Sequence, residues 1–323
     1  MSIDAEVAWL LAGLAAVLSA ATLVGRLLQA RVSARSNGGE SPGSALSPAT
    51  VRNLNQRIGA WWVLAIVAGL ALLAGKAGLV TLFAVASFLA LREFVTLAYT
   101  RRGDHWALIA SFFVIAPIQY ALVWVEWYGL FAIFIPVYAF ALLPVASVIR
   151  GDTQRFLERA AKVQWGLMLC VYCLSYVPAL VTLEIPGYGG REVLLAAFLL
   201  LVVQASDVLQ YICGKLVGRT PVAPAVSPSK TLEGTLGGIA LATALGAALA
   251  GLTPFAAWQA GALALAAALA GFAGGLVMSA IKRDCGVKDW GELIEGHGGV
   301  LDRLDSLVFS APVFFHIVRY FWT

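Results

Sequence analysis

Residues 255–281 read FAAWQAGALALAAALAGFAGGLVMSAI, and residues 282–306 continue as KRDCGVKDWGELIEGHGGVLDRLDS. The first segment is long and apolar enough to cross a bilayer core, which takes about 20 apolar residues in a helix. The second segment places both signs of charge directly beside it. Because charge is costly next to a bilayer, a dense cluster of mixed sign at this position indicates a functional site.

The composition of the whole chain agrees with this reading. Of the 323 residues, 60% are hydrophobic and 12% are charged, whereas soluble domains average roughly 25% charged residues. The sequence therefore predicts an all-α, polytopic integral membrane protein. The net charge is +4, but no basic face with interleaved aromatic residues is evident, so we expect no nucleic-acid partner.

Ten apolar runs are long enough to be transmembrane helices. They cover residues 7–29, 58–75, 77–98, 106–125, 128–149, 163–183, 193–213, 234–252, 255–281 and 305–322. Of the 22 lysines and arginines, all but Lys76, Arg191 and Arg319 lie in or beside the odd-numbered connections. Basic residues are retained on the cytoplasmic side of membranes. The odd connections are therefore predicted to be cytoplasmic, and both termini to lie on the non-cytoplasmic side.

The ninth connection and its flanks hold the first group of candidate residues. Ser279, Lys282 and Arg283 share one helix face, where they either anchor the helix end or contact an anionic ligand. Asp302 and Asp305 share a face of the last helix. They either cap that helix or, beside a polyphosphate, hold a magnesium ion.

A tight turn precedes these aspartates at His297, Gly298 and Gly299. Glycine lets a backbone approach a ligand closely, so the turn is predicted to shape a phosphate site. His297 either contacts phosphate or forms a hydrogen bond within the loop.

The seventh connection and its flanks supply a second group. Asp207 interrupts the apolar sequence LLLVVQASDVLQY at residues 199–211. An ionisable residue in such a span is a functional candidate, with a hydrogen bond to a neighbouring helix as the alternative. Residues 227–234, SPSKTLEG, place hydroxyls and Lys230 before a helix N-terminus, which suits an anion. The alternative is a capped loop with one anchoring lysine.

These two segments resemble the phosphatidate cytidylyltransferases, or CDP-diacylglycerol synthases. The family signature Ser-x-apolar-Lys-Arg, Lys-Asp and His-Gly-Gly-apolar-x-Asp-Arg-apolar-Asp is matched at every element within residues 279–305. The resemblance covers about residues 200–322, and the first half resembles the family only as apolar helices. Two positions depart from it. Glu295 stands where many members carry proline, and Gly275 where many carry an acidic residue.

The resemblance implies transfer of CMP from CTP to phosphatidate, giving CDP-diacylglycerol and pyrophosphate. The catalytic candidates are Asp207, Lys230, Lys282, Arg283, Asp289, His297 and Asp302. The substrate-binding candidates are Ser227, Thr231, Ser279, Lys288, Gly298, Gly299 and Arg303. The candidate ligands of Mg²⁺ are Asp207, Asp289, Asp302 and Asp305, with a second cation as an open alternative.

The domain division follows from the same pattern. Residues 1–57 are predicted to form an N-terminal transmembrane helix and a flexible cytoplasmic linker, because residues 33–50 are rich in serine, glycine and proline. Residues 58–323 are predicted to form a membrane-embedded cytidylyltransferase domain with its signature elements in residues 200–306. The expected location is the bacterial inner membrane with the active site facing the cytoplasm, and the resemblance implies a homodimer.

Three other functions stay open at this point. A CTP-dependent lipid-alcohol kinase would transfer the γ-phosphate of CTP to an alcohol. A transporter would spread its charges over several helices at mid-depth, whereas here they gather at one end. An inactive relative is the third alternative, because Gly275 provides no carboxylate.

Overall fold

The computed structural model describes residues 3–36, 48–149, 151–293 and 298–323. Helices dominate this part of the chain, which confirms the prediction of an all-α polytopic membrane protein. The described residues contain nine helical stretches long and apolar enough to cross a membrane. They are Ala5–Val32, Thr50–Leu73, Gly75–Leu97, Arg102–Trp124, Tyr128–Val148, Phe156–Thr182, Val193–Val217, Ala257–Asp284 and Leu301–Trp322.

The eighth predicted run, residues 234–252, is the one not among these nine; it corresponds to a shorter apolar helix of 17 residues, Leu232–Ala248. Several spans are divided by short 3-10 or π-helical segments. The elements in chain order are α1 (Ile3–Ser36), α2 (Pro48–Leu73), α3 (Gly75–Leu97), η1 (Arg102–Asp104), α4 (His105–Ala110), η2 (Ser111–Ile115), α5 (Ala116–Trp124), α6 (Tyr128–Ile133), η3 (Phe134–Ala139), α7 (Phe140–Val148), α8 (Phe156–Leu167), η4 (Met168–Cys173), α9 (Leu174–Ala179), η5 (Leu180–Thr182), α10 (Val193–Val217), β1 (Pro221–Ala223), β2 (Ser227–Thr231), α11 (Leu232–Ala248), η6 (Ala250–Leu252), α12 (Ala257–Asp284), α13 (Leu301–Leu304) and α14 (Leu307–Trp322).

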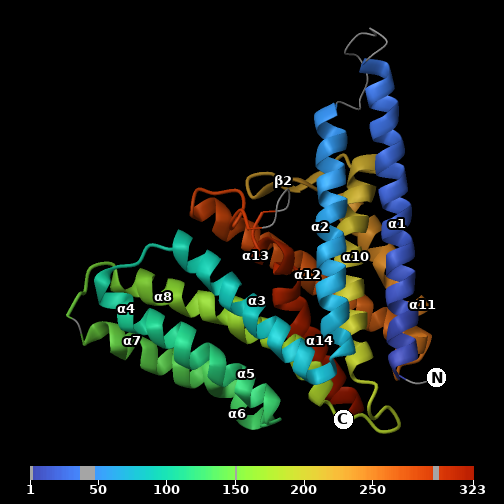
Figure 1. The fold of residues 1–323 in the computed structure, drawn as a ribbon. Coiled ribbons are helices and arrows are strands. Elements are labelled where there is room, and N and C mark those ends of the chain that lie inside the picture. Colours follow the sequence, from blue (N-terminus) through green and yellow to red (C-terminus); the bar gives the residue numbers. More distant parts are fainter. Residues whose placement is uncertain (1–2, 37–47, 150, 294–297) are drawn as a thin grey trace.

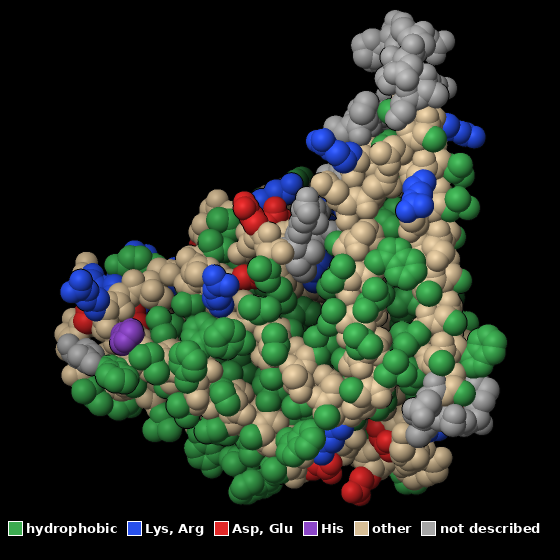
Figure 2. Space-filling view, in the orientation of Figure 1, with side chains coloured by type: hydrophobic (Ala, Val, Ile, Leu, Met, Phe, Trp, Pro, Cys, Tyr) green, Lys and Arg blue, Asp and Glu red, His purple; other side chains and the backbone are tan. Residues whose placement is uncertain are grey.

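The helices form two groups that differ in tilt. Figure 1 shows α1 and α2 as a long pair beside α10 and α11, and it shows α3 to α8 as a second, inclined group. The N and C termini lie at one end of the molecule, and β2 and α13 lie toward the other. Hydrophobic side chains cover the flank of the helices, and charged side chains gather toward its two ends (Figure 2). This distribution fits a protein whose flank contacts lipid.

Glycines allow the C-terminal helices to pack closely. A methyl group added to Gly238 of α11 would lie 2.3 Å from the backbone nitrogen of Gln210 in α10. One added to Gly271 of α12 would lie 2.9 Å from the hydroxyl of Ser310 in α14. Close approach of backbones is a general way in which helices associate in lipid. These contacts hold α10 against α11 and α12 against α14, and candidate residues lie on α10, on α12 and on α13, just before α14.

The structure corrects the expectation about one irregular segment and adds detail to a second. Part of residues 33–50 is helical, because α1 continues to Ser36 and α2 begins at Pro48; the rest of the predicted linker, residues 37–47, lies outside the described residues. The connection between α10 and α11 contains a short antiparallel hairpin of β1 and β2. Glu233 braces this hairpin, since its carboxylate accepts hydrogen bonds from the backbone N–H groups of Arg219 and Thr220 at 2.9 and 3.1 Å.

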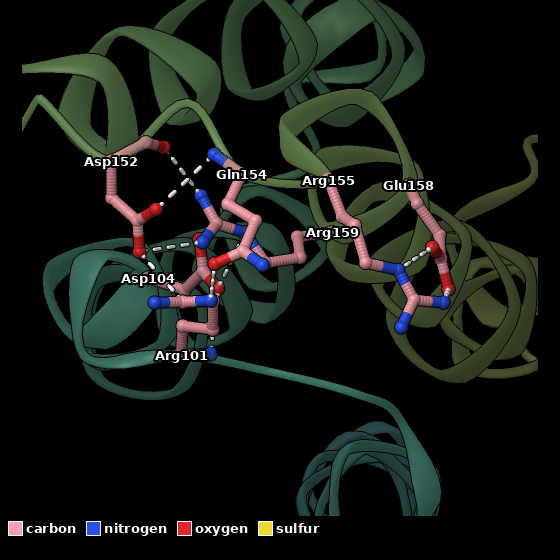
Figure 3. A network of polar contacts seen from close by, with 7 residues as sticks. All are labelled: Arg101, Asp104, Asp152, Gln154, Arg155, Glu158 and Arg159. Carbon is pink, nitrogen blue, oxygen red and sulfur yellow. Dashed lines mark hydrogen bonds and ion pairs between the residues drawn. The ribbon is translucent and has the colours of Figure 1, made fainter.

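A buried arginine fastens the second group of helices. Arg159 of α8 is fully buried, and its guanidinium lies 2.8 Å from a carboxylate oxygen of Asp152 and 3.3 Å from one of Asp104 (Figure 3). Arg101 also pairs with Asp152, at 2.9 Å. The network joins the loop before α4 to the loop before α8. It therefore holds the inclined group together near the end of α3.

Candidate active site

A buried ion pair joins the end of α12 to the start of the last span. The ammonium of Lys282 donates a hydrogen bond to Oδ1 of Asp302 at 2.7 Å, and only 4% of the Asp302 side chain is exposed. Oδ2 of Asp302 accepts the backbone N–H of Trp290 at 2.7 Å and that of Gly299 at 2.9 Å. Asp302 thus folds the 285–300 connection back onto α12.

The two glycines of the predicted phosphate turn make room for carboxylates of the protein itself. Gly298 has φ +82°, and a methyl group on it would lie 2.7 Å from Oδ2 of Asp302. A methyl group on Gly299 would lie 2.3 Å from Oε2 of Glu93. These internal contacts are enough to require glycine. His297, the other predicted member of the turn, lies outside the described residues, as does Glu295.

Glu93 of α3 is a site residue that the sequence analysis missed. Its two carboxylate oxygens accept the backbone N–H groups of Val300 and Leu301, each at 2.9 Å. The sequence does indicate Glu93 as a candidate, because it is an ionisable residue within an apolar run, as Asp207 is. Asp207 has a second indication, since it lies in the part of the chain that resembles the family.

A second cluster combines Asp207 of α10 with residues at the start of the last span. The Asp207 carboxylate is close enough to Asp305, Lys230 and Ser306 to interact electrostatically with them. Asp207 and Asp305 are both partly buried. Arg303 also lies within electrostatic reach of both carboxylates. The structure thus gathers these four predicted residues with Lys282 and Asp302 around the junction of α10, α12 and α13.

Two cations of this cluster have no close anionic partner. Among the described residues, neither Lys230 nor Arg303 forms an ion pair within 4.0 Å, and Nε of Arg303 is buried without a hydrogen-bond partner. The ammonium of Lys230 lies 5.2 Å from the ring centre of Phe272. A methyl group on Gly275 would lie 2.9 Å from this ammonium, so Gly275 leaves room for it. Such cations are suited to bind an anionic ligand.

Other predicted residues lie around this cluster in supporting contacts. Arg283 is exposed and donates hydrogen bonds to the carbonyl oxygens of Val226 and Val287, each at 3.2 Å. Thr231 caps α11 by accepting the N–H of Gly234 at 3.3 Å. The remaining predicted residues are Ser279, whose hydroxyl donates to the carbonyl oxygen of Gly275 at 2.7 Å, the exposed Lys288 and Asp289, and the partly buried Ser227.

The fit of a magnesium ion can be judged from the carboxylates. No group of three or more His, Cys, Asp or Glu side chains in the described ranges is arranged to hold a metal. Asp302 already accepts three hydrogen bonds. Asp207 and Asp305 offer two partly buried carboxylates, and magnesium commonly takes one or two carboxylates together with waters and substrate phosphates. This pair therefore fits the ion, and magnesium binding stays a prediction.

Comparisons with known proteins give the family. The model of the Cytidylyltransferase family matches residues 55–321. The uncharacterized protein YnbB of Escherichia coli is 39% identical over 314 residues, which are 96% of this chain and 97% of that protein. A phosphatidate cytidylyltransferase of Helicobacter pylori is 46% identical over 125 residues, 38% of this chain and 46% of the enzyme. For one of Synechocystis the identity is 44% over 116 residues, 35% of this chain and 39% of the enzyme.

The two named enzymes match less than half of their own length, whereas the family match extends through nearly all of the described helices. The match includes every residue of the clusters around Asp207 and Asp302. It also includes α3, which contributes Glu93. The chain belongs to the cytidylyltransferase family, and it is an integral membrane nucleotidyltransferase.

Proposed function

We propose that the protein transfers CMP from CTP to phosphatidate, giving CDP-diacylglycerol and pyrophosphate. The observation that carries the proposal is the pair of cations Lys230 and Arg303, which have no close anionic partner within the described part of the chain and lie beside the carboxylates of Asp207 and Asp305. A nucleotide and a phospholipid headgroup are both anionic, so they need such cations. The relatives named phosphatidate cytidylyltransferase support this choice of substrates.

The chemistry needs charge neutralisation more than it needs a base. An oxygen of the lipid phosphate bonds to the α-phosphorus of CTP, and the bond from that phosphorus to the bridging oxygen breaks as pyrophosphate leaves. The nucleophile is already anionic, so the main obstacle is repulsion between phosphates. Lys230 and Arg303 would offset this repulsion. Magnesium held by Asp207 and Asp305 would supply further positive charge when bound.

The position of the cluster suits both substrates. It lies at an end of membrane-spanning helices, where a lipid headgroup can arrive laterally from the bilayer and a nucleotide from water. The positive-inside pattern places this end in the cytoplasm, where CTP is available, and the proposed location is the bacterial inner membrane. The homodimer implied by the resemblance stays a prediction.

The test is a transfer assay on the purified full-length protein with phosphatidate, magnesium and CTP labelled at either the α- or the γ-phosphorus. We expect the α-label in the lipid product and the γ-label in pyrophosphate. Lys230→Met should lower kcat/KM about a hundredfold, the cost of removing one electrostatic group from such a site. Lys76→Met is the matched control, because Lys76 pairs with Glu126 at the other end of α3.

Two results would contradict the proposal. Transfer of the γ-label to a lipid alcohol would indicate a kinase. Absence of any labelled lipid from a folded, magnesium-supplied protein would indicate another acceptor or an inactive relative.

A further inference from the structure

We propose that Glu93 is a positioning residue, which holds the turn of residues 298–302 in place so that Asp302 and Lys282 keep their orientation in the active site. The catalytic part of this inference rests on the proposed cytidylyltransferase reaction. The structural part does not, since it concerns contacts within the protein. Glu93 lies against Gly299, a predicted substrate-binding residue, and we infer that it acts through the backbone of the turn.

Glu93 contacts the turn through hydrogen bonds from backbone N–H groups to its carboxylate. Glu93 accepts N–H groups of two consecutive residues, Val300 and Leu301, one on each carboxylate oxygen and each at 2.9 Å. The next N–H group toward the N-terminus, that of Gly299, binds Asp302 at 2.9 Å. Three successive backbone donors are therefore shared between two carboxylates. Hydrogen bonds to an ionised acceptor are roughly twice as strong as neutral ones, so this arrangement fixes the turn in one conformation.

Two glycines show how closely Glu93 approaches the connection. A methyl group on Gly299 would lie 2.3 Å from one carboxylate oxygen of Glu93, and one on Gly291 would lie 3.1 Å from the other. Gly299 has no positive φ to account for it. Its lack of a side chain is explained by the space that the Glu93 carboxylate needs.

The neighbouring residue of α3 holds the other side of the same connection. The ring of Phe94 stacks on that of Trp290, with centres 5.3 Å apart and an interplanar angle of 25°. The backbone N–H of Trp290 is the second backbone donor to Asp302, at 2.7 Å. Phe94 is buried, and a methyl group on Gly166 of α8 would lie 3.0 Å from its ring. Glu93 and Phe94 are consecutive residues of α3. Together they contact the two segments whose backbone N–H groups, those of Gly299 and Trp290, bind Asp302.

The first experiment measures the turn directly, by amide hydrogen exchange of the full-length protein in detergent. Glu93→Gln leaves one acceptor oxygen and places an NH₂ group against a backbone N–H, whereas Glu93→Ala removes both acceptors. We expect the amides of Val300 and Leu301 both to exchange at least about tenfold faster in Glu93→Ala, as for the loss of a charged hydrogen bond, and at least one of them to do so in Glu93→Gln. Glu126→Gln is the control, because Glu126 pairs with Lys76 at the other end of α3. Unchanged exchange at these two amides would overturn the inference.

The second experiment is a double-mutant cycle that needs no activity. Gly299→Ala in the wild type forces a methyl group against the Glu93 carboxylate and should lower the midpoint of thermal unfolding. In the Glu93→Ala background that clash is absent, so the same substitution should lower the midpoint much less. Equal effects in both backgrounds would show that the two residues are not coupled and would also overturn the inference.

The third readout separates positioning from stability alone. At a temperature where all variants are folded, Glu93→Gln should lower kcat with little change in KM for CTP. Glu93→Ala should lower kcat further, by about a hundredfold, which is the effect of misplacing active-site groups by about 1 Å. A purely structural role would leave kcat per folded molecule at the wild-type value. If the wild type itself shows no transfer, the proposed function fails, and the exchange and double-mutant results still decide the structural role of Glu93.

Discussion

At the scale of single residues, the Lys282–Asp302 pair is the contact whose loss should cost most. Both side chains are buried, and the carboxylate also accepts two backbone N–H groups. The sequence suggested Asp302 as a magnesium ligand. The structure shows that its oxygens organise the connection between α12 and α13, so loss of Asp302 should affect stability as well as activity.

The prediction concerns Asp302→Asn, which leaves the Lys282 ammonium buried without its counter-charge. Breaking a buried pair in this way costs about 3 kcal/mol or more of the free energy of unfolding, and activity should fall about a hundredfold. Adding Lys282→Met removes the uncompensated charge and should recover much of the stability but none of the activity. Thermal unfolding followed in detergent and the α-label assay measure the two effects. Additive losses of stability would contradict this account.

At the scale of elements, the network around Arg159 holds the inclined helices (Figure 3). A hydrogen bond from Arg159 is the main reason why the pKa of Asp152 is lowered below its usual value; burial acts in the opposite direction. A carboxyl whose pKa is lowered on folding contributes stability at pH values above its unfolded pKa, about 3.9. That contribution is lost as the pH falls through the lower pKa of the folded state.

Asp152→Asn should therefore lower the midpoint of thermal unfolding at pH 7. The gap from the wild type should begin to shrink below about pH 4 and nearly close at more acidic pH, because the wild-type carboxyl then also becomes neutral. Thermal scans of both proteins across this range test the expectation. Asp284→Asn, at an exposed carboxylate, serves as control. A gap that stayed constant with pH would show that the loss came from packing and not from the ion pair.

At the scale of the whole molecule, the chain termini share one end (Figure 1). This requires an even number of membrane passes, which is reached when the shorter helix α11 is counted with the nine longer stretches of the described residues. The charge pattern predicts that this end is non-cytoplasmic. Single cysteines introduced into a cysteine-free background can test this in spheroplasts with a membrane-impermeant maleimide. Glu184→Cys, in the sixth connection, should be labelled in intact spheroplasts, and Thr153→Cys, in the fifth, only after lysis. The reverse labelling pattern would show the opposite orientation and would contradict a candidate active site on the cytoplasmic side.

Much of the fold could be predicted from short windows of sequence. Each of the ten apolar runs is helical, because about 20 consecutive apolar residues in lipid must satisfy their backbone hydrogen bonds within a helix. The hairpin of β1 and β2 could not be predicted in this way. Its residues are mostly polar or proline, and its position depends on Glu233, which lies beyond the strands and binds the loop before them.

The candidate site was predicted in part. Asp207, Lys230, Lys282, Asp302, Arg303 and Asp305 lie around one junction. Their relative roles could not be read from spacing. Lys282 and Arg283 are neighbours in sequence, yet the first is buried against Asp302 and the second is exposed and binds the carbonyl of Val226. Neighbouring residues on a helix point about 100° apart, and only the packing of other elements decides which of them is enclosed.

The sequence by itself determined that this chain crosses the membrane repeatedly and which connections hold the charged candidate residues, because hydropathy and charge density are properties of consecutive residues. Only the tertiary structure decided which charges are used within the fold and which are left for a ligand. Lys282 is paired, whereas Lys230 and Arg303 have no close anionic partner among the residues that the structure describes. Glu93 acts on a turn more than 200 positions away. Such contacts form when helices distant in sequence pack together, and no local pattern records them.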